Sequence, residues 1–190
     1  MNTTDAPVEK LKRMIMNTTD APVEKLNLID TLQKLCVAYN FEEEIEDALQ
    51  KIYNDCDIHH YNDLHNVFEK FKDVDRKFKS SLINDVQGML NLGEAAHFAI
   101  HGEDILDEAL AFTATQLKSV ASRVSTHVAE EINHTLKFSI RKSVPRLEAR
   151  FFLSTNARDD SHNKTLLKFA KLDYNILQLR HRKQLSDILK

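Results

Sequence analysis

The sequence contains very few of the residues that interrupt helices. It has 3 glycines and 3 prolines among 190 residues, whereas average usage would give roughly a dozen glycines and nine or ten prolines in this length. This scarcity argues against a loop-rich β protein and against a collagen-like or disordered chain. It favours long helices connected by short joints, so we expect an all-α fold.

Other absences narrow the possible setting of the protein. The 2 cysteines, Cys36 and Cys56, form no CxxC pair and no spaced Cys/His quartet, which favours a reducing compartment without structural zinc. No apolar run approaches the ~20 residues that cross a bilayer. The N-terminus MNTTDAPVEK resembles neither a secretory signal nor a transit peptide. We expect a cytoplasmic protein that does not bind membranes.

Charge is nearly balanced along the chain. The net charge is −3 and the isoelectric point is about 6.3, so no global positive field recruits nucleic acid. Only the last stretch, from Lys164 to Lys190, is visibly basic, and Asp173 and Asp187 interrupt it. Charge on the outer face of a helix is the ordinary case. We therefore expect no nucleic-acid partner.

The start of the chain occurs twice. The segment MNTTDAPVEKL occupies residues 1–11 and again residues 16–26. A repeat this short cannot form a solenoid, whose units need roughly 20–50 residues and several copies. We interpret it as a duplication of the start and expect residues 1–24 to form a mobile N-terminus. Residues 25–190 are then the folded domain.

Apolar residues at helical spacing organise the remainder of the chain. The stretch Leu90–Leu117 is the centre of the prediction: two helices that meet at a corner formed by His101–Asp104. Further helices are expected in antiparallel hairpins packed in sequence. The expected helical ranges are 26–36, 41–53, 64–71, 78–98 with a break near Gly88 or Gly93, 105–117, 124–136, 145–155 and 164–188.

Two Glu-x-x-His steps offer a possible metal site. Glu94 with His97, and Glu131 with His134, lie on two expected helices, and Glu46 and Glu108 are spare carboxylates. Two such steps with two further glutamates make the di-iron carboxylate site of helix bundles. The step also arises easily by chance in a chain with 9 histidines and 29 acidic residues. We favour solvated or packed histidines over a metal site.

A second candidate is the segment Asp159-Asp160-Ser161-His162-Asn163. It is similar to the aspartate-rich box that holds magnesium against a diphosphate, but Asn163 is a weak ligand in the last position. We expect Asp160 or Ser161 to cap the next helix instead. Neither cysteine has an evident histidine base, and no glycine-rich phosphate loop occurs. We therefore expect no catalytic, cofactor-binding or metal-binding residue in this chain.

Three stretches resemble the N-terminal domain of plant terpene synthases of the sesquiterpene type. They are Lys25–Tyr53, Ser81–Ser119 and Val144–Ile188, the last including the KLDYN signature at Lys171–Asn175. The resemblance implies an antiparallel helical α-barrel that carries no catalysis. It also implies that farnesyl diphosphate is ionised with Mg²⁺ in a separate C-terminal domain. This chain stops at Lys190, where the family continues into that domain, so a catalytic domain is the expected partner.

The sequence departs from the family pattern at several places. An upstream Arg-Pro…Trp stretch is absent, and about twenty family residues are missing between Leu64 and Val67. Gly93 replaces an aromatic residue, and the loss of a buried ring costs roughly 3–5 kcal/mol. The barrel is therefore expected to be incomplete and marginally stable.

Two functions are compatible with these observations. The first is a structural and shielding domain of a terpene synthase, inactive alone. The alternative is a non-enzymatic helical interaction module that associates, with itself or another protein, through exposed apolar helix faces. The surfaces expected to take part surround Leu179, Leu185, Ile188 and Leu189, and the gap beside Leu64–Phe71.

Overall fold

A computed structural model describes residues 5–17, 22–55, 64–156 and 163–189. Within these ranges the chain is helical, and its only β feature is an isolated bridge between Lys72 and Phe78. The all-α prediction is confirmed. The chain divides into two compact units: unit 1 comprises Met1–Cys56 with Pro145–Lys190, and unit 2 comprises Asp57–Val144. Each unit is described separately.

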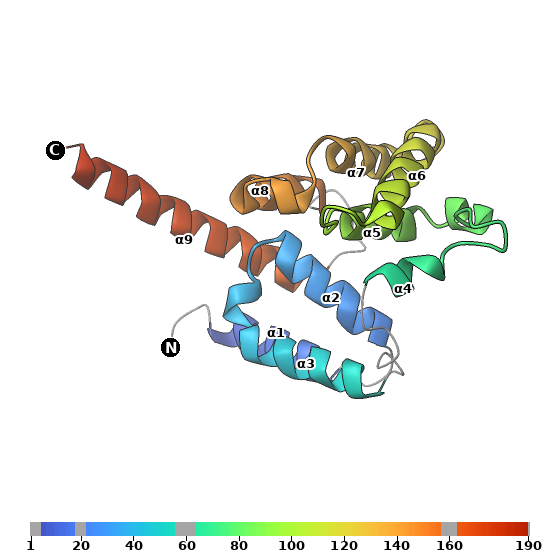
Figure 1. Cartoon of the computed structure of the whole chain (residues 1–190). Helices are drawn as coiled ribbons and strands as arrows, with labels where there is room; N and C mark the ends of the chain where they lie inside the picture. The colour runs from blue at the N-terminus through green and yellow to red at the C-terminus, as the bar shows by residue number, and fades with distance from the viewer. Residues whose placement is uncertain (1–4, 18–21, 56–63, 157–162, 190) are drawn as a thin grey trace. The chain divides into compact units, whose positions relative to one another are not determined.

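Unit 1 is built from both ends of the chain (Figure 1). Its core contains the buried side chains of Leu11, Ile15 and Leu32. Phe41 and Phe169 meet edge to face, with 5.7 Å between ring centroids, which joins the start of the third helix to the last helix. Its elements are α1 (Asp5–Asn17), α2 (Pro22–Lys34), the 3₁₀ turn η1 (Ala38–Asn40), α3 (Glu42–Asp55), α8 (Pro145–Asn156) and α9 (Lys164–Ile188).

The N-terminal segment is not a mobile tail over most of its length. Helix α1 covers Asp5–Asn17, and its Leu11 and Ile15 are almost completely buried. Lys12 Nζ lies 2.6 Å from Glu44 Oε1 on α3. The prediction of a mobile segment up to residue 24 is therefore wrong for α1, because its apolar stripe packs into unit 1.

The capping residue of α9 differs from the prediction, although the helix begins at Lys164 as expected. Asn163 caps the helix, because its Oδ1 accepts hydrogen bonds from the backbone N–H groups of Thr165 and Leu166 at 3.0 and 3.2 Å. Asp160 and Ser161, which we expected to cap, lie outside the described residues. Asparagine is as good a cap as aspartate, so the helix begins three residues later than Asp160 would set it.

Unit 2 contains the predicted helical corner. Helix α5 does not begin within a longer helix, since Asp85 separates it from η3 and its Oδ1 accepts from Gly88 N at 2.8 Å. The predicted break near Gly88 or Gly93 therefore lies at Asp85 instead, and α5 runs through both glycines. The elements are α4 (Leu64–Glu69), η3 (Ser80–Asn84), α5 (Val86–Ala96), α6 (Asp104–Val120), α7 (Thr126–Lys137) and η4 (Ile140–Lys142).

Helices α5 and α6 form the centre of unit 2. One cluster of buried residues joins Phe68 to Leu92, Ala96 and Leu106. A second cluster joins Leu90 on α5 to Leu117 on α6 and Ile132 on α7, with other apolar neighbours. Phe68 is only 1% exposed, so this part of the predicted apolar gap at 64–71 is filled within unit 2.

Gly93 lies buried at the contact between α5 and α6. A Cβ atom at Gly93 would lie 3.1 Å from Thr113 Oγ1 and 3.5 Å from Thr113 Cβ. The Thr113 hydroxyl donates to Ala109 O at 2.9 Å, so it is held on its own helix. A glycine at residue 93 therefore allows the two helices to approach closely, and no space for an aromatic ring exists beside Thr113.

We expect Gly93→Ala alone to change the free energy of unfolding little, because the gain in helix propensity of about 1 kcal/mol is offset by the contact with Thr113. In a Thr113→Ala background the same substitution should stabilise the protein by about 1 kcal/mol. Urea unfolding of the four proteins measures this coupling. Equal effects of Gly93→Ala in both backgrounds would contradict it.

Candidate functional site

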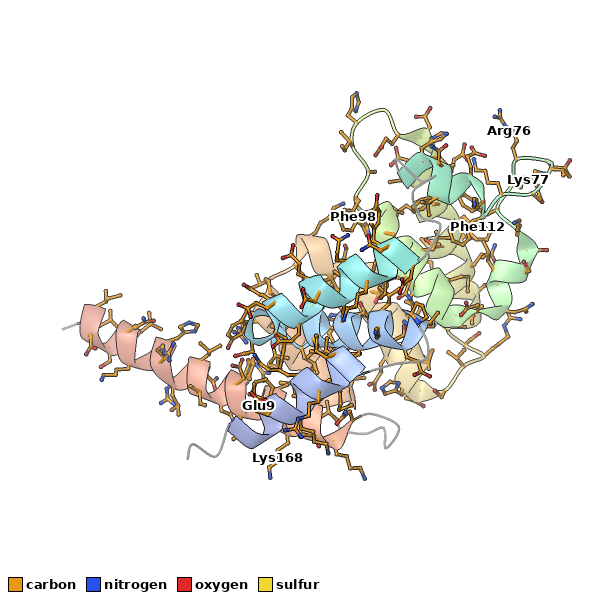
Figure 2. All side chains as sticks on the ribbon, turned by 90° about the horizontal axis from the view of Figure 1, so that it is seen from below. Glu9, Arg76, Lys77, Phe98, Phe112 and Lys168 are labelled. Atoms are coloured by element: carbon orange, nitrogen blue, oxygen red, sulfur yellow. The ribbon has the colours of Figure 1, made fainter. Side chains whose placement is uncertain are left out.

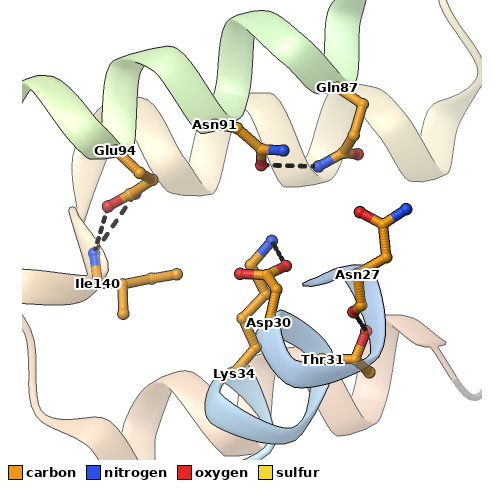
Figure 3. A network of polar contacts seen from close by, with 8 residues as sticks. All are labelled: Asn27, Asp30, Thr31, Lys34, Gln87, Asn91, Glu94 and Ile140. Carbon is orange, nitrogen blue, oxygen red and sulfur yellow. Dashed lines mark hydrogen bonds and ion pairs between the residues drawn. The ribbon is translucent and has the colours of Figure 1, made fainter. Parts of the chain in front are cut away.

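The residues singled out as metal ligands have structural partners. Glu94 on α5 accepts a hydrogen bond from Ser139 Oγ at 3.1 Å. It also accepts one from the Ile140 N–H at 3.2 Å, which Figure 3 shows. The carboxylate thereby holds the start of η4 against α5 within unit 2. Glu108 Oε2 lies 2.5 Å from Lys72 Nζ. Both carboxylates act as anchors between elements.

The remaining members of the two Glu-x-x-His steps do not form one site with Glu94. The His134 ring packs against Phe138, with 5.4 Å between centroids. The described residues contain no group of three or more His, Cys, Asp or Glu side chains placed to hold a metal. The Mg²⁺ implied by the resemblance therefore finds no ligand set there, and Asp159 and Asp160 lie outside these residues.

His97 is the most perturbed of the candidate residues. Its Nδ1 is buried and has no hydrogen-bond partner among the residues described. Burial lowers the pKa of His97, and the positive charge of Lys142 lowers this pKa further. The imidazole therefore favours its neutral form and acts as a packing group at the end of α5.

The surface that stands out is the last helix. Leu172, Ile176 and Leu179 follow one another at intervals of four and three residues, and they are 40%, 47% and 63% exposed. Side chains at this spacing share one face of a helix. We call these three residues the proximal stripe of α9. An exposed row of large aliphatic side chains is typical of a docking surface.

A second apolar face lies nearer the end of α9. From Gln178 to Leu189 every residue is exposed, and Leu185, Ile188 and Leu189 share one side of the helix. We call these three residues the distal face. Figure 2 shows side chains radiating on all sides of this half of the helix. None of the helices in the described ranges is long and apolar enough to span a membrane.

A carboxylate near the middle of α9 ties the helix to other elements of unit 1. Asp173 accepts a hydrogen bond from the Tyr39 hydroxyl through Oδ1, and its Oδ2 lies 3.4 Å from Arg146 Nη1. Asp173 thus ties α9 to η1 and to the first turn of α8. A hollow of about 260 Å³ beside Arg146 continues along α9, bordered by Leu177, His181 and Leu185 among others. The middle of α9 is therefore fixed while its apolar faces stay open.

Comparison with protein families gives a consistent match. The family model described as "Terpene synthase, N-terminal domain" matches residues 1–67 and 57–136. The two matched segments overlap between residues 57 and 67, around the place where the resemblance puts missing family residues. The match also starts at residue 1, ahead of the predicted domain boundary at Lys25.

Curated relatives match nearly the whole chain. An (E)-beta-farnesene synthase of Citrus junos is 49% identical over 201 residues, which cover 94% of this chain and 35% of the relative. A (-)-germacrene D synthase of Vitis vinifera is 46% identical, covering 95% of this chain and 36% of the relative. The chain therefore spans little more than a third of the length of these relatives.

Solved structures agree with the sequence matches. Isoprene synthase from grey poplar leaves has a TM-score of 0.90 at 28% identity, over 97% of this chain and 39% of that protein. A limonene synthase has a TM-score of 0.86 at 25% identity, over 96% of this chain and 38% of that protein. The predicted fold class, the all-helical arrangement of this domain, is thus confirmed.

We expect Asp173→Ala to lower the free energy of unfolding by about 1.5–3 kcal/mol, because it removes charge-assisted hydrogen bonds and leaves Arg146 without this partner. The matched control is Asp47→Ala, on an exposed position of α3. Urea unfolding followed by circular dichroism gives both values. Equal stability of the two variants would contradict the anchoring role of Asp173.

Protonation of His97 should destabilise the fold. Because burial lowers the pKa of folded His97 below 6.5, the unfolded chain binds this proton more readily. The contribution of His97 is therefore fully present above pH 6.5 and is lost as the pH falls through the folded pKa. We expect His97→Gln to reduce the loss of unfolding free energy on acidification, measured in urea, whereas the exposed control His101→Gln should leave it unchanged. An identical pH profile for wild type and His97→Gln would refute this.

Proposed function

Because the chain belongs to the terpene synthase family, through that family's N-terminal domain, we propose that it is the structural domain of a sesquiterpene synthase. In this role it supports and shields a catalytic domain and has no lyase activity of its own. The catalytic domain is its partner, and the proximal stripe of α9 is the contact.

The proximal stripe is the observation that carries this proposal. Leu172, Ile176 and Leu179 are exposed on a helix that, nearer its start, buries Leu166, Phe169 and Ala170. Burying one leucine side chain is worth about 1.5–3 kcal/mol, so the open stripe represents a large gain for any partner that covers it. The relatives contain, beyond the matched third, a further part of the polypeptide that can supply such a partner.

The lack of lyase activity is supported by how the acidic side chains are used. Glu94, Glu108 and Asp173 each hold two elements together, and ionisation of a diphosphate calls for carboxylates free to bind Mg²⁺. One isoprene synthase structure was determined with three Mg²⁺ ions and a diphosphate analogue. This chain covers 39% of that protein. We propose that the corresponding chemistry belongs to the part of such proteins that this chain does not cover.

The sesquiterpene assignment comes from the relatives. Their names include (E)-beta-farnesene, (-)-germacrene D and (+)-delta-cadinene synthases, which supports farnesyl diphosphate as the substrate of the whole enzyme. We propose a cytoplasmic location for it, since Cys36 is a free thiol and free thiols are typical of reducing compartments.

The absence of lyase activity is tested directly. Purified chain incubated with farnesyl diphosphate and Mg²⁺ should release no terpene detectable by gas chromatography. The (E)-beta-farnesene synthase of Citrus junos, treated identically, is the positive control. Release of any terpene by the chain, above a boiled sample, would overturn this part of the proposal.

The proximal stripe is tested by binding. The chain should bind the part of Vitis vinifera (-)-germacrene D synthase that it does not match, prepared as a separate polypeptide, in a titration followed by calorimetry. Ile176→Asp should weaken this binding about tenfold or more, because a charge would face an apolar partner.

The matched control is Val74→Asp, which places the same charge at a residue that is 99% exposed in unit 2. It should bind as the wild type does. Equal binding of Ile176→Asp and wild type would show that the catalytic part does not use the proximal stripe.

A further inference from the structure

Unit 1 carries an acidic groove that the proposed function does not use. It has a volume of about 570 Å³ and is bordered by η1 and α3, with side chains from the end of α2. Tyr39, Leu49 and Tyr53 are each between 41% and 49% exposed. The residues that matter here combine apolar walls with carboxylates: Tyr39, Glu42, Ile45, Glu46, Leu49 and Tyr53.

The groove lies on the most acidic helix of the chain. Helix α3 contains Glu42, Glu43, Glu44, Glu46, Asp47 and Asp55 against one cation, Lys51. Of these, Glu44 is neutralised by Lys12, whereas Glu42 and Glu46 border the groove itself. An apolar floor flanked by carboxylates fits a helix that presents aliphatic side chains beside arginine or lysine.

The distal face of α9 has this chemistry. Arg182 lies one turn before Leu185 on the same side of the helix, whereas Arg180 and Lys183 lie on other sides of it. Asp187 is the only acid from Gln178 to Leu189. The distal face is therefore a fully exposed apolar surface with the cation Arg182 at its edge.

The helix end cannot reach the groove of its own chain. Tyr39, at the border of the groove, bonds Asp173, and Leu185 lies twelve residues further along a continuous helix, about 18 Å away along the axis. In Figure 1, α9 runs past α8 without a bend. Any partner for the groove of this type therefore comes from another molecule.

We propose that the distal face of α9 from one copy of the chain docks in the α3 groove of a second copy. Arg182 meets Glu42 and Glu46, and Leu185 and Leu189 cover Leu49 and Tyr53. Pairing of two distal faces with each other is disfavoured, because it brings like charges together. The contact joins two different surfaces and so adds copies head to tail. It does not rest on the proposed function, which uses the proximal stripe.

The experiment is sedimentation velocity of the purified 190-residue chain over a wide range of concentration and at two salt concentrations. The average sedimentation coefficient should rise continuously with concentration and fall when salt is added, since exposed charge pairs are screened. The double variant Glu42→Lys, Glu46→Lys and the single variant Arg182→Glu should each associate about tenfold more weakly or worse.

The decisive sample is an equimolar mixture of the two charge-reversed variants. In each variant alone, the groove and the distal face carry charges of the same sign and repel. In the mixture, the groove of each variant meets the oppositely charged distal face of the other, so association should return. The matched control is Glu43→Lys, which makes the same charge change at an exposed residue of α3 outside the groove. It should associate as the wild type does.

Three results would overturn the proposal. The first is a monomer at every concentration, which leaves the distal face to another occupant. The second is a dimer whose formation does not depend on salt. The third is association that both charge-reversed variants retain. Circular dichroism checks that the variants keep their helices. If a variant loses its helices, the neutral double variant Glu42→Gln, Glu46→Gln is measured in its place. These neutral changes should weaken association and remove most of its salt dependence, and unchanged association would equally refute the proposal.

Discussion

Helix ends set the main constraint on this structure, because the chain has few glycines and prolines with which to end a helix. Every helix leaves backbone N–H groups without partners in its first turn. Polar side chains meet this need at Asp85 before α5, Ser125 before α7 and Asn163 before α9. The positions of these three residues decide where the helices begin, and the directions of the apolar faces follow from those starts.

The helices themselves could be predicted from the sequence, since their apolar residues recur at helical spacing. The capping residues of α5 and α9 could not be predicted, because several nearby residues were chemically able to cap. Asp160, Ser161 and Asn163 are all good caps, and local sequence does not rank them. Similarly, the sequence shows only that Gly93 stands where the family has an aromatic residue. The position of Thr113 on the next helix explains why a small residue fits there.

The duplicated segment shows that packing decides whether equivalent residues of the same sequence are buried or exposed. Leu11 and Leu26 occupy equivalent places in two identical stretches, and both lie in helices. Leu11 is completely buried, whereas Leu26 is 42% exposed. Helix formation is thus a property of the segment, but burial depends on the residues that come after it, since Ile15 extends the apolar stripe of α1. The same reasoning explains the candidate metal ligands, whose partners Ser139 and Lys72 lie far away in the sequence.

Cys36 gives unit 1 an internal chemical reporter. It has a positive φ of 54°, and its Sγ donates to Pro145 O at 3.0 Å, across 109 residues of sequence. Burial raises the pKa of the Cys36 thiol, and the thiolate is the form that reacts with alkylating reagents. Alkylation of Cys36 therefore requires this hydrogen bond to break, so its rate follows the opening of the contact between the start of α8 and the loop after α2. The residue converts a transient separation of the two ends of the chain into a permanent covalent mark.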